Sequence, residues 1–314
     1  MLAIQTKYGV LEGVSHVECY EDGSVKECMV IMENRIATPY GTLIPQYEQD
    51  GVRRKYTKSL SFHKNGTVKS VSLQEQTPIK TSIGVFPAEL MTFYESGAVK
   101  RLFPLNGKIT GYWTEENEYS LAREFEFSFP FGSFRKKIIG VQFYESGAVK
   151  SLTFWPRDSV TLQTPLGEVS VRIGIALYPQ GGIKSIEPYK PVTVSTPIGN
   201  ITAFDRRAVG VHGDTNSLGF YEDGKVRHVA TSSDRILVKD STGREKSYEP
   251  ALKPSLLQAG KVSIEPLQIH FFDGKVQLGG EAIYDISSCI FTIESSAKIP
   301  GNMCSECSGC DACG

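Results

Sequence analysis

A ten-residue phrase, Phe143 to Leu152 (FYESGAVKSL), recurs seven times along this chain of 314 residues. The residue before the central glycine of each copy is mostly Asp, Asn or Ser, which favour turns, and glycine accepts a positive φ without a Cβ clash. Asp-Gly or Asn-Gly between apolar segments is a strong signal for a β-hairpin. We therefore predict a hairpin tip at each copy. The central glycines are Gly23, Gly66, Gly97, Gly147, Gly181, Gly224 and Gly274.

The phrase leaves the register of its hairpin open. A two-residue loop would pair Tyr144 with Val149 and Phe143 with Lys150, whereas a three-residue loop with a bulge would pair Tyr144 with Lys150. The choice decides which side chains face the core.

A second phrase of the type Thr-Pro-x-Gly alternates with the first. Proline at its second position and glycine at its fourth favour a type I turn. From each glycine of the first phrase to the next glycine of the second, the gaps are 18, 18, 35, 20, 18 and 19 residues, so the alternation is a true repeat. The copies are Thr38 to Gly41, Thr164 to Gly167 and Thr196 to Gly199, with a variant at Phe129 to Gly132 and degenerate copies ending at Gly9, Gly84 and Gly243.

The alternation of the two phrases predicts an all-β protein of tandem antiparallel β-hairpin repeats, with seven units in an elongated or curled sheet. Neighbouring units would bury each other's faces in one array over residues 1–298. A flexible cysteine-rich tail would follow over residues 299–314. A seven-bladed β-propeller is the alternative, although most units are short for a four-stranded blade.

Three columns repeat with the phrase. We interpret them as cross-strand ion pairs and aromatic contacts that stabilise a sheet, because the acidic column neutralises the basic stripe that an anionic partner or lipid headgroups would need. The columns are basic (Lys26, Lys69, Lys100, Lys150, Lys184, Arg227), acidic (Glu21, Glu95, Glu145, Glu222) and aromatic (Tyr20, Tyr94, Tyr144, Tyr178, Tyr221).

The composition narrows the classes of partner. Basic and acidic residues nearly balance, 34 against 35, which argues against bulk electrostatic binding of nucleic acid. No segment has the length and apolar character of a signal peptide or a membrane-spanning helix. We expect a cytoplasmic protein without a transmembrane segment, whose partner is a protein; peripheral contact with lipid is not favoured.

Several smaller features have both a chemical and a structural interpretation, and we favour the structural one for each. Arg53, Arg54 and Lys55 form a basic run that is typical of a solvated loop rather than an anion site. Cys19 and Cys28 flank the first tip and resemble small buried hydrophobic residues.

Two further groups are treated in the same way. His212, Asp214 and His228 have no spacing that demands a metal or acid–base site, so we expect isolated surface histidines. Four phenylalanines alternate at period two, which places them on one face of a strand, as core rather than as a platform for nucleic-acid bases. They are Phe125, Phe127, Phe129 and Phe131.

The chemically distinctive segment is the C-terminal tail, in which four cysteines are spaced by two residues each: Cys304, Cys307, Cys310 and Cys313. Thiolates at this spacing can converge on one soft metal centre. The run differs from the ferredoxin pattern, which has three residues before its last cysteine and a proline after it. Zinc would fit as a compact four-cysteine site, because the longer spacer between finger ligand pairs is missing. Transient disulfide chemistry and an unligated tail are the alternatives.

The phrase Tyr-Glu-Ser-Gly-Ala-Val-Lys-Ser, residues 144–151, resembles the variant MORN repeat of bacterial proteins labelled YwqK-like antitoxins. The resemblance covers about ten residues in each of the seven units. The units here are longer, and the Thr-Pro-x-Gly phrase lies outside that repeat. The resemblance implies an antiparallel β-array used for binding or scaffolding, and it brings no catalytic residues.

Three functions fit these observations. The first is a noncatalytic scaffold or binding protein whose tail holds an iron–sulfur cluster or zinc. The second is a redox or electron-transfer accessory, or an enzyme, that acts through the tail. The third is a tail that serves as the substrate of a modifying enzyme. We find no catalytic constellation in the sequence and favour a protein that is not an enzyme.

Overall fold

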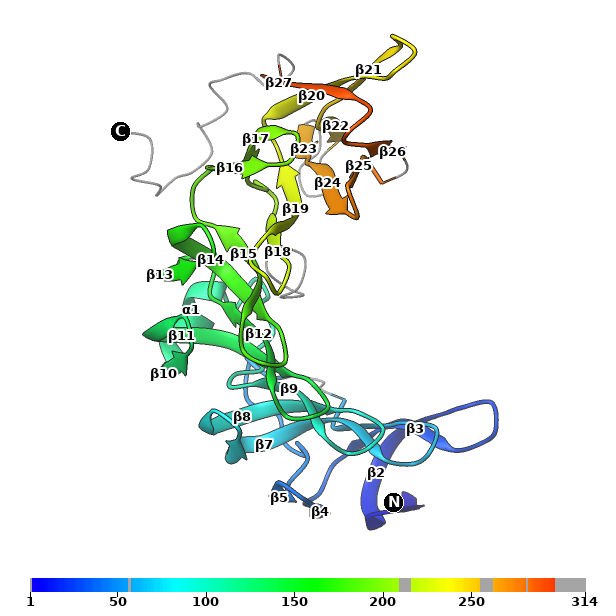
Figure 1. The fold of residues 1–314 in the computed structure, drawn as a ribbon. Coiled ribbons are helices and arrows are strands. Elements are labelled where there is room, and N and C mark those ends of the chain that lie inside the picture. The colour runs from blue at the N-terminus through cyan, green and yellow to red at the C-terminus, as the bar shows by residue number, and fades with distance from the viewer. Residues whose placement is uncertain (1, 56–57, 209–215, 255–261, 281, 297–314) are drawn as a thin grey trace. The chain divides into compact units, whose positions relative to one another are not determined.

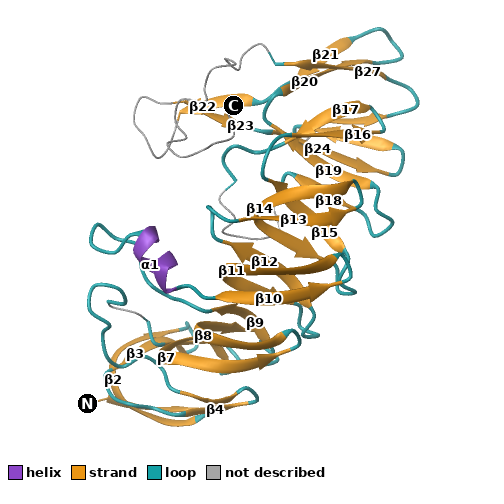
Figure 2. Ribbon diagram, turned by 90° about the vertical axis from the view of Figure 1, so that its left-hand side faces the viewer, coloured by secondary structure: helices purple, strands orange, loops and turns teal. Residues whose placement is uncertain are grey.

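The computed structural model describes residues 2–55, 58–208, 216–254, 262–280 and 282–296. Its strands are antiparallel, and one short helix lies among the described residues. Contacts divide the chain into two compact units, described separately below. Unit 1 holds Met1–Val160 and Ile173–Ile183, and unit 2 holds Thr161–Arg172, Lys184–Val209 and the chain from Thr215 on. Figures 1 and 2 show the strands of each unit.

Each copy of the first phrase forms the tip of a hairpin, which we call a phrase hairpin. Eighteen strands belong to one sheet. Separate blades would instead be separate sheets, so the propeller alternative is wrong and the predicted sheet of hairpin repeats is confirmed. The phrase hairpins join β2 (Gly9–Cys19) to β3 (Val25–Val30), β6 (Leu60–Phe62) to β7 (Val68–Thr81), β8 (Gly84–Phe93) to β9 (Val99–Phe103), β11 (Gly132–Phe143) to β12 (Val149–Phe154), β14 (Gly167–Leu177) to β15 (Ile183–Pro188), β18 (Leu218–Phe220) to β19 (Val226–Thr231), and β24 (Leu267–Phe272) to β25 (Lys275–Leu278).

The first six tips have the three-residue loop of the second alternative, but their residue pairs differ from both predicted registers. In the fourth copy the Tyr144 N–H donates to the carbonyl of Ala148 at 2.7 Å. Phe143 pairs with Val149 and Gln142 with Ser151, so Lys150 is the extra residue of a bulge. Gly147 has a φ of 86°, which closes the turn without steric cost. The bulge directs both Phe143 and Val149 into the core.

The seventh phrase hairpin is different. Phe272 pairs with Lys275 across the two loop residues Asp273 and Gly274. Both have positive φ, 47° and 72°, as a type I′ turn requires. The degenerate sequence of the last copy is thus a shorter turn without a bulge.

Each second phrase forms another hairpin tip, and the tips that begin with a threonine are called threonine tips. At Thr164 the hydroxyl donates to the carbonyl of Gly167 at 2.9 Å and accepts the N–H of Leu166 at 3.1 Å. Second-phrase hairpins also involve β1 (Leu2–Thr6) with β2, β4 (Ile36–Thr38) with β5 (Gly41–Leu43), β7 with β8, β10 (Glu124–Phe129) with β11, β16 (Val192–Thr196) with β17 (Gly199–Ala203), and β20 (Asp234–Lys239) with β21 (Glu245–Tyr248). β13 (Ser159–Thr164) precedes the tip at Gly167.

Four tyrosines of the aromatic column each bond to the following phrase hairpin. The Tyr94 hydroxyl donates to the carbonyl of Phe143 at 2.9 Å, and the Tyr144 hydroxyl donates to that of Leu177 at 2.9 Å. The same contact joins Tyr20 to Phe62 and Tyr221 to Phe271. A residue predicted to make aromatic contacts is therefore a hydrogen-bond donor between repeats.

The core of each unit lies where strands have neighbours on both edges. In unit 1 Leu102 pairs with Met91 on one side and Val141 on the other, and all three are buried. In unit 2 Val229 pairs with Leu218 and Ile269 in the same way. The remaining strands are β22 (Ala251–Pro254), β23 (Val262–Glu265), β26 (Ala282–Asp285) and β27 (Ile290–Ser295).

Candidate functional site

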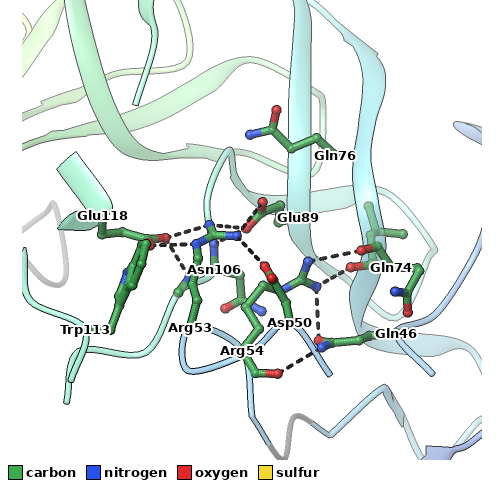
Figure 3. A network of polar contacts seen from close by, with 12 residues as sticks. Gln46, Asp50, Arg53, Arg54, Gln74, Gln76, Glu89, Asn106, Trp113 and Glu118 are labelled. Atoms are coloured by element: carbon green, nitrogen blue, oxygen red, sulfur yellow. Dashed lines mark hydrogen bonds and ion pairs between the residues drawn. The ribbon is translucent and has the colours of Figure 1, made fainter. Parts of the chain in front are cut away.

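The basic run Arg53-Arg54-Lys55 lies in unit 1, and its two arginines are buried, contrary to the solvated loop that we predicted. Arg53 is 7% exposed and Arg54 is 2% exposed, while Lys55 is exposed. The backbone N–H groups of both arginines donate to the carbonyl of Asp50, which forms the turn that carries them inward. Figure 3 shows the network of polar side chains around the two guanidinium groups.

Arg53 lies between two buried carboxylates. Its Nη1 and Nη2 donate to Glu89 on β8 at 3.0 and 2.7 Å. Its Nε and Nη2 donate to Glu118 at 2.8 Å each. Two bidentate pairs on one guanidinium are the strong, geometrically specific form of this interaction. All three side chains are less than one tenth exposed.

Glu118 comes from helix α1 (Glu115–Leu121), in the segment that the sequence predicts as one or two helical turns. Thr114 caps the helix, and Asn117 completes a capping box with it. Glu118 also accepts the N–H of Gly107 at 2.7 Å and the indole N–H of Trp113 at 2.6 Å. The carboxylate thus ties the helix, its preceding loop and the arginine loop together.

These contacts fix the charges of the network. Burial would lower the pKa of Arg53, but its hydrogen bonds to Glu118 and Glu89 outweigh burial and raise the pKa. Burial opposes ionisation of Glu118 too, yet the hydrogen bond from Arg53 and those from Trp113 and Gly107 hold its pKa below the usual value. The ionised forms are therefore the stable ones, and the donors of Arg53 toward both glutamates are already engaged.

Arg54 is held by neutral acceptors. It donates to the carbonyl of Gln74 at 3.2 Å, to the side chain of Gln46 at 3.0 Å and to the carbonyl of Leu73. Burial lowers its pKa. The arrangement matches a structural clamp that joins two insertions to β7 and β8, in which the Nε of Arg54 is buried without a hydrogen-bond partner among the described residues.

The isolated surface histidine predicted at position 228 is a buried residue of unit 2. His228 is 7% exposed, and its Nε2 lies 2.8 Å from the carbonyl of Asn216. Burial, the largest influence, lowers its pKa to about 4. His212 and Asp214, the other members of that candidate site, lie outside the described residues.

A buried carboxylate lies in the same unit. Glu187 accepts the hydroxyl and the N–H of Ser217 at 2.6 and 2.8 Å, and Arg172 is 3.7 Å away. Burial raises the pKa of Glu187 despite these contacts. No other carboxylate contacts it among the residues described, so a paired acid–base arrangement is not formed there.

The predicted aromatic stripe is a face of β10 and its turn. Phe127 is buried, and Phe125, Phe129 and Phe131 are half-buried. Phe129 and Phe131 stack at 5.1 Å between ring centroids, and Phe125 contacts Phe86 at 5.0 Å. The core prediction therefore holds for Phe127, whereas the other three rings stack at the edge of the core and stay partly exposed.

The four tail cysteines, Cys304, Cys307, Cys310 and Cys313, lie outside the described residues. Within the described part of the chain, three or more potential ligands nowhere gather around one point. Cys28 is buried, which raises the pKa of its thiol to about 11. Cys19, predicted to be buried as well, is exposed.

An open groove of unit 2 lies between two threonine tips and two phrase hairpins. Its volume is about 680 Å³, and its walls are mostly apolar, with Pro197, Tyr221, Val226, Phe271 and Ile286 among the lining residues. On the seventh hairpin, no atom lies within 4 Å of the position that a Cβ at Gly274 would take. On the sixth, a Cβ at Gly224 would lie 3.3 Å from the side chain of Pro165. The groove therefore lies beside the tip of the seventh hairpin, which has fewer close neighbouring atoms than the tip of the sixth hairpin.

Comparison with known proteins found no match to a family model, to a curated protein or to a solved structure. Among the described residues no helix is long and apolar enough to cross a membrane.

Proposed function

We propose that the chain is a noncatalytic scaffold or binding protein of the cytoplasm, in which a β-repeat array carries a C-terminal ligand set of Cys304, Cys307, Cys310 and Cys313 for a metal or an iron–sulfur cluster. The observation that carries this proposal is the closure of the strongest polar cluster. The guanidinium of Arg53 is engaged by Glu89 and Glu118 inside the protein, which favours a structural role over a catalytic one.

The remaining surfaces favour binding to a protein. The groove beside Pro197 and Phe271 is lined mainly by apolar side chains, and hydrophobic grooves are a recurring docking site for peptide segments of other proteins. The ligand set of the tail is made of thiolates, which favour zinc or iron–sulfur clusters over hard cations.

The test is the metal content of the full chain purified without oxygen. We expect about one zinc ion or one iron–sulfur cluster per chain, because four thiolates complete the coordination of such a centre. Metal analysis, acid-labile sulfide and the visible absorption spectrum distinguish the two.

The control variant replaces cysteines outside the tail. Changing all four tail cysteines to serine is expected to abolish the metal, whereas Cys19→Ser with Cys289→Ser leaves it unchanged. A colourless, metal-free wild-type protein with four titratable tail thiols would contradict the ligation proposal. If the metal is present and removal of the tail abolishes only a redox activity, the result favours the electron-transfer alternative.

A further inference from the structure

The phrase hairpins are joined by one rule, and the first of them lacks the neighbour that the rule provides. The first strand of a phrase hairpin pairs with the second strand of the preceding hairpin. Val141 on β11 pairs with Leu102 on β9, and Ile175 on β14 pairs with Leu152 on β12. The residue that corresponds to Val141 in the first hairpin is Val17 on β2.

The outer edge of β2 is only half covered. β1 pairs with it from Gly9 to Val14 and no further. Among the described strands none pairs with this edge beyond Val14, although the inner edge continues to pair with β3 as far as Cys19. The backbone of the segment His16 to Cys19 therefore presents an open β-edge.

Two positions that are buried in the next five copies of the repeat are more exposed in the first hairpin. Val17 is only half-buried, whereas the residues of its column in the next five copies are all buried: Leu60, Met91, Val141, Ile175 and Leu218. Cys19 is exposed, whereas the residues of its column in those copies are also buried: Phe62, Phe93, Phe143, Leu177 and Phe220. Both positions miss the apolar cover that a neighbouring strand supplies elsewhere.

We propose that this edge is a self-association surface, on which β2 of a second copy of the chain pairs antiparallel with β2. The proposal is independent of the metal and protein ligands proposed above. Every strand pairing described for the sheet is antiparallel, and an antiparallel pair of identical edges is closed by a twofold axis. Open edges of this kind are templates for pairing with another chain.

Complementarity between His16 and Glu18 favours one register. With the twofold axis at Val17, the two Val17 side chains face each other, and His16 of each copy lies opposite Glu18 of the other. Opposite charges directly across strands stabilise a pair, whereas like charges destabilise it. The symmetric register thus joins the apolar positions and sets an imidazole, which donates an N–H whether neutral or protonated, opposite a carboxylate twice.

The C-terminal edge strand does not offer the alternative of head-to-tail growth. β26 pairs antiparallel with β25, which itself pairs antiparallel with β24, so β26 runs in the direction of a first strand. A β2 strand that continued the array beside β26 would pair with it in parallel, unlike every described pairing of the sheet. The association is therefore a closed dimer and not a filament.

The test is sedimentation equilibrium of the full chain with reductant present, so that tail thiols form no disulfides. The edge is short, and we expect a reversible dimer with a dissociation constant of about 10–100 µM. His16→Glu places two glutamates opposite each other across the axis twice and is expected to weaken association about tenfold, and Glu18→Lys, which removes the acceptor of the imidazole, is expected to weaken it as well. The double variant His16→Glu with Glu18→Lys is expected to restore it.

Two controls separate pairing from damage to the fold. Glu222→Lys reverses an exposed charge at another tip and is expected to leave the dimer unchanged. The double variant also lacks the ion pair of Glu18 with Lys26, so its recovery cannot come from that contact. The proposal is overturned if the wild type stays monomeric at about 10–100 µM or assembles beyond a dimer. It is also overturned if the double variant associates no more tightly than the single variants.

Discussion

Replacing Arg53 with alanine is expected to lower the free energy of unfolding by about 3–5 kcal/mol, because it leaves two buried carboxylates without their common partner. Glu89 and Glu118 both bond to that guanidinium, and each is less than one tenth exposed. Urea unfolding followed by tryptophan fluorescence measures the change, and Trp113 is a local reporter because its indole N–H donates to Glu118.

Two further variants show that the loss comes from uncompensated charge. Arg35→Ala removes an arginine that is 71% exposed in its pair with Glu33, and we expect a change below about 0.5 kcal/mol. Replacing Arg53, Glu89 and Glu118 together by Met, Leu and Leu is expected to cost less than Arg53→Ala, since no buried carboxylate is left without its partner. A loss under about 1 kcal/mol for Arg53→Ala would place this pair among ordinary surface ion pairs and contradict the buried network.

Gly174→Ala is expected to destabilise unit 1 by about 3 kcal/mol or more, because the new methyl group has no room. A Cβ built at Gly174 lies 2.4 Å from the carbonyl oxygen of Leu152 on the paired strand β12. The obstacle is main chain, so no side-chain rotation relieves it. The preceding residue, Ile173, already has a φ of 66°, which is strained for a β-branched side chain and limits local adjustment.

Gly182→Ala is the matched control for this substitution. Nothing lies within 4 Å of a Cβ at Gly182, and its φ is outside the left-handed region. We expect a change within about 0.5 kcal/mol. Denaturant midpoints of the two variants that are equal would show that β12 and β14 are not in the close register described here.

The sequence was sufficient to predict the hairpin tips but not their register. Glycine after Asp, Asn or Ser marks a turn by local sterics alone, so Gly97 and Gly147 were identifiable as tips. The register depends on a bulge at residues such as Lys150. The bulge arises because the side chains of Phe143 and Val149 both pack in the core. Only the assembled sheet decides between such local alternatives.

The polar network could not be predicted because its members come from distant segments. Arg53 and Glu118 are 65 residues apart in the chain, and each lies in an insertion that breaks the repeat. The run Arg53-Arg54-Lys55 looks solvated by composition, since buried arginines are rare unless paired. The signal that was available is the coincidence of two insertions, one basic and one rich in glutamate.

The buried histidine was missed for a related reason. His228 lies opposite Gly219 on β18, and a Cβ at Gly219 would lie 2.1 Å from the imidazole. The missing side chain of Gly219 provides the space that the ring fills. A glycine in one strand and a histidine in the next are not informative until their pairing is known.

The central claim is that successive phrase hairpins join edge to edge, and amide hydrogen exchange tests it most directly. Residues five positions after the tip glycines Gly66, Gly97, Gly147 and Gly224 are fully buried and paired on both sides: Val71, Leu102, Leu152 and Val229. We predict that their amides are among the slowest to exchange in the chain, at a similar level in all four copies. Amides at these four positions that exchange as fast as that of Tyr112, which is 84% exposed, would contradict the array.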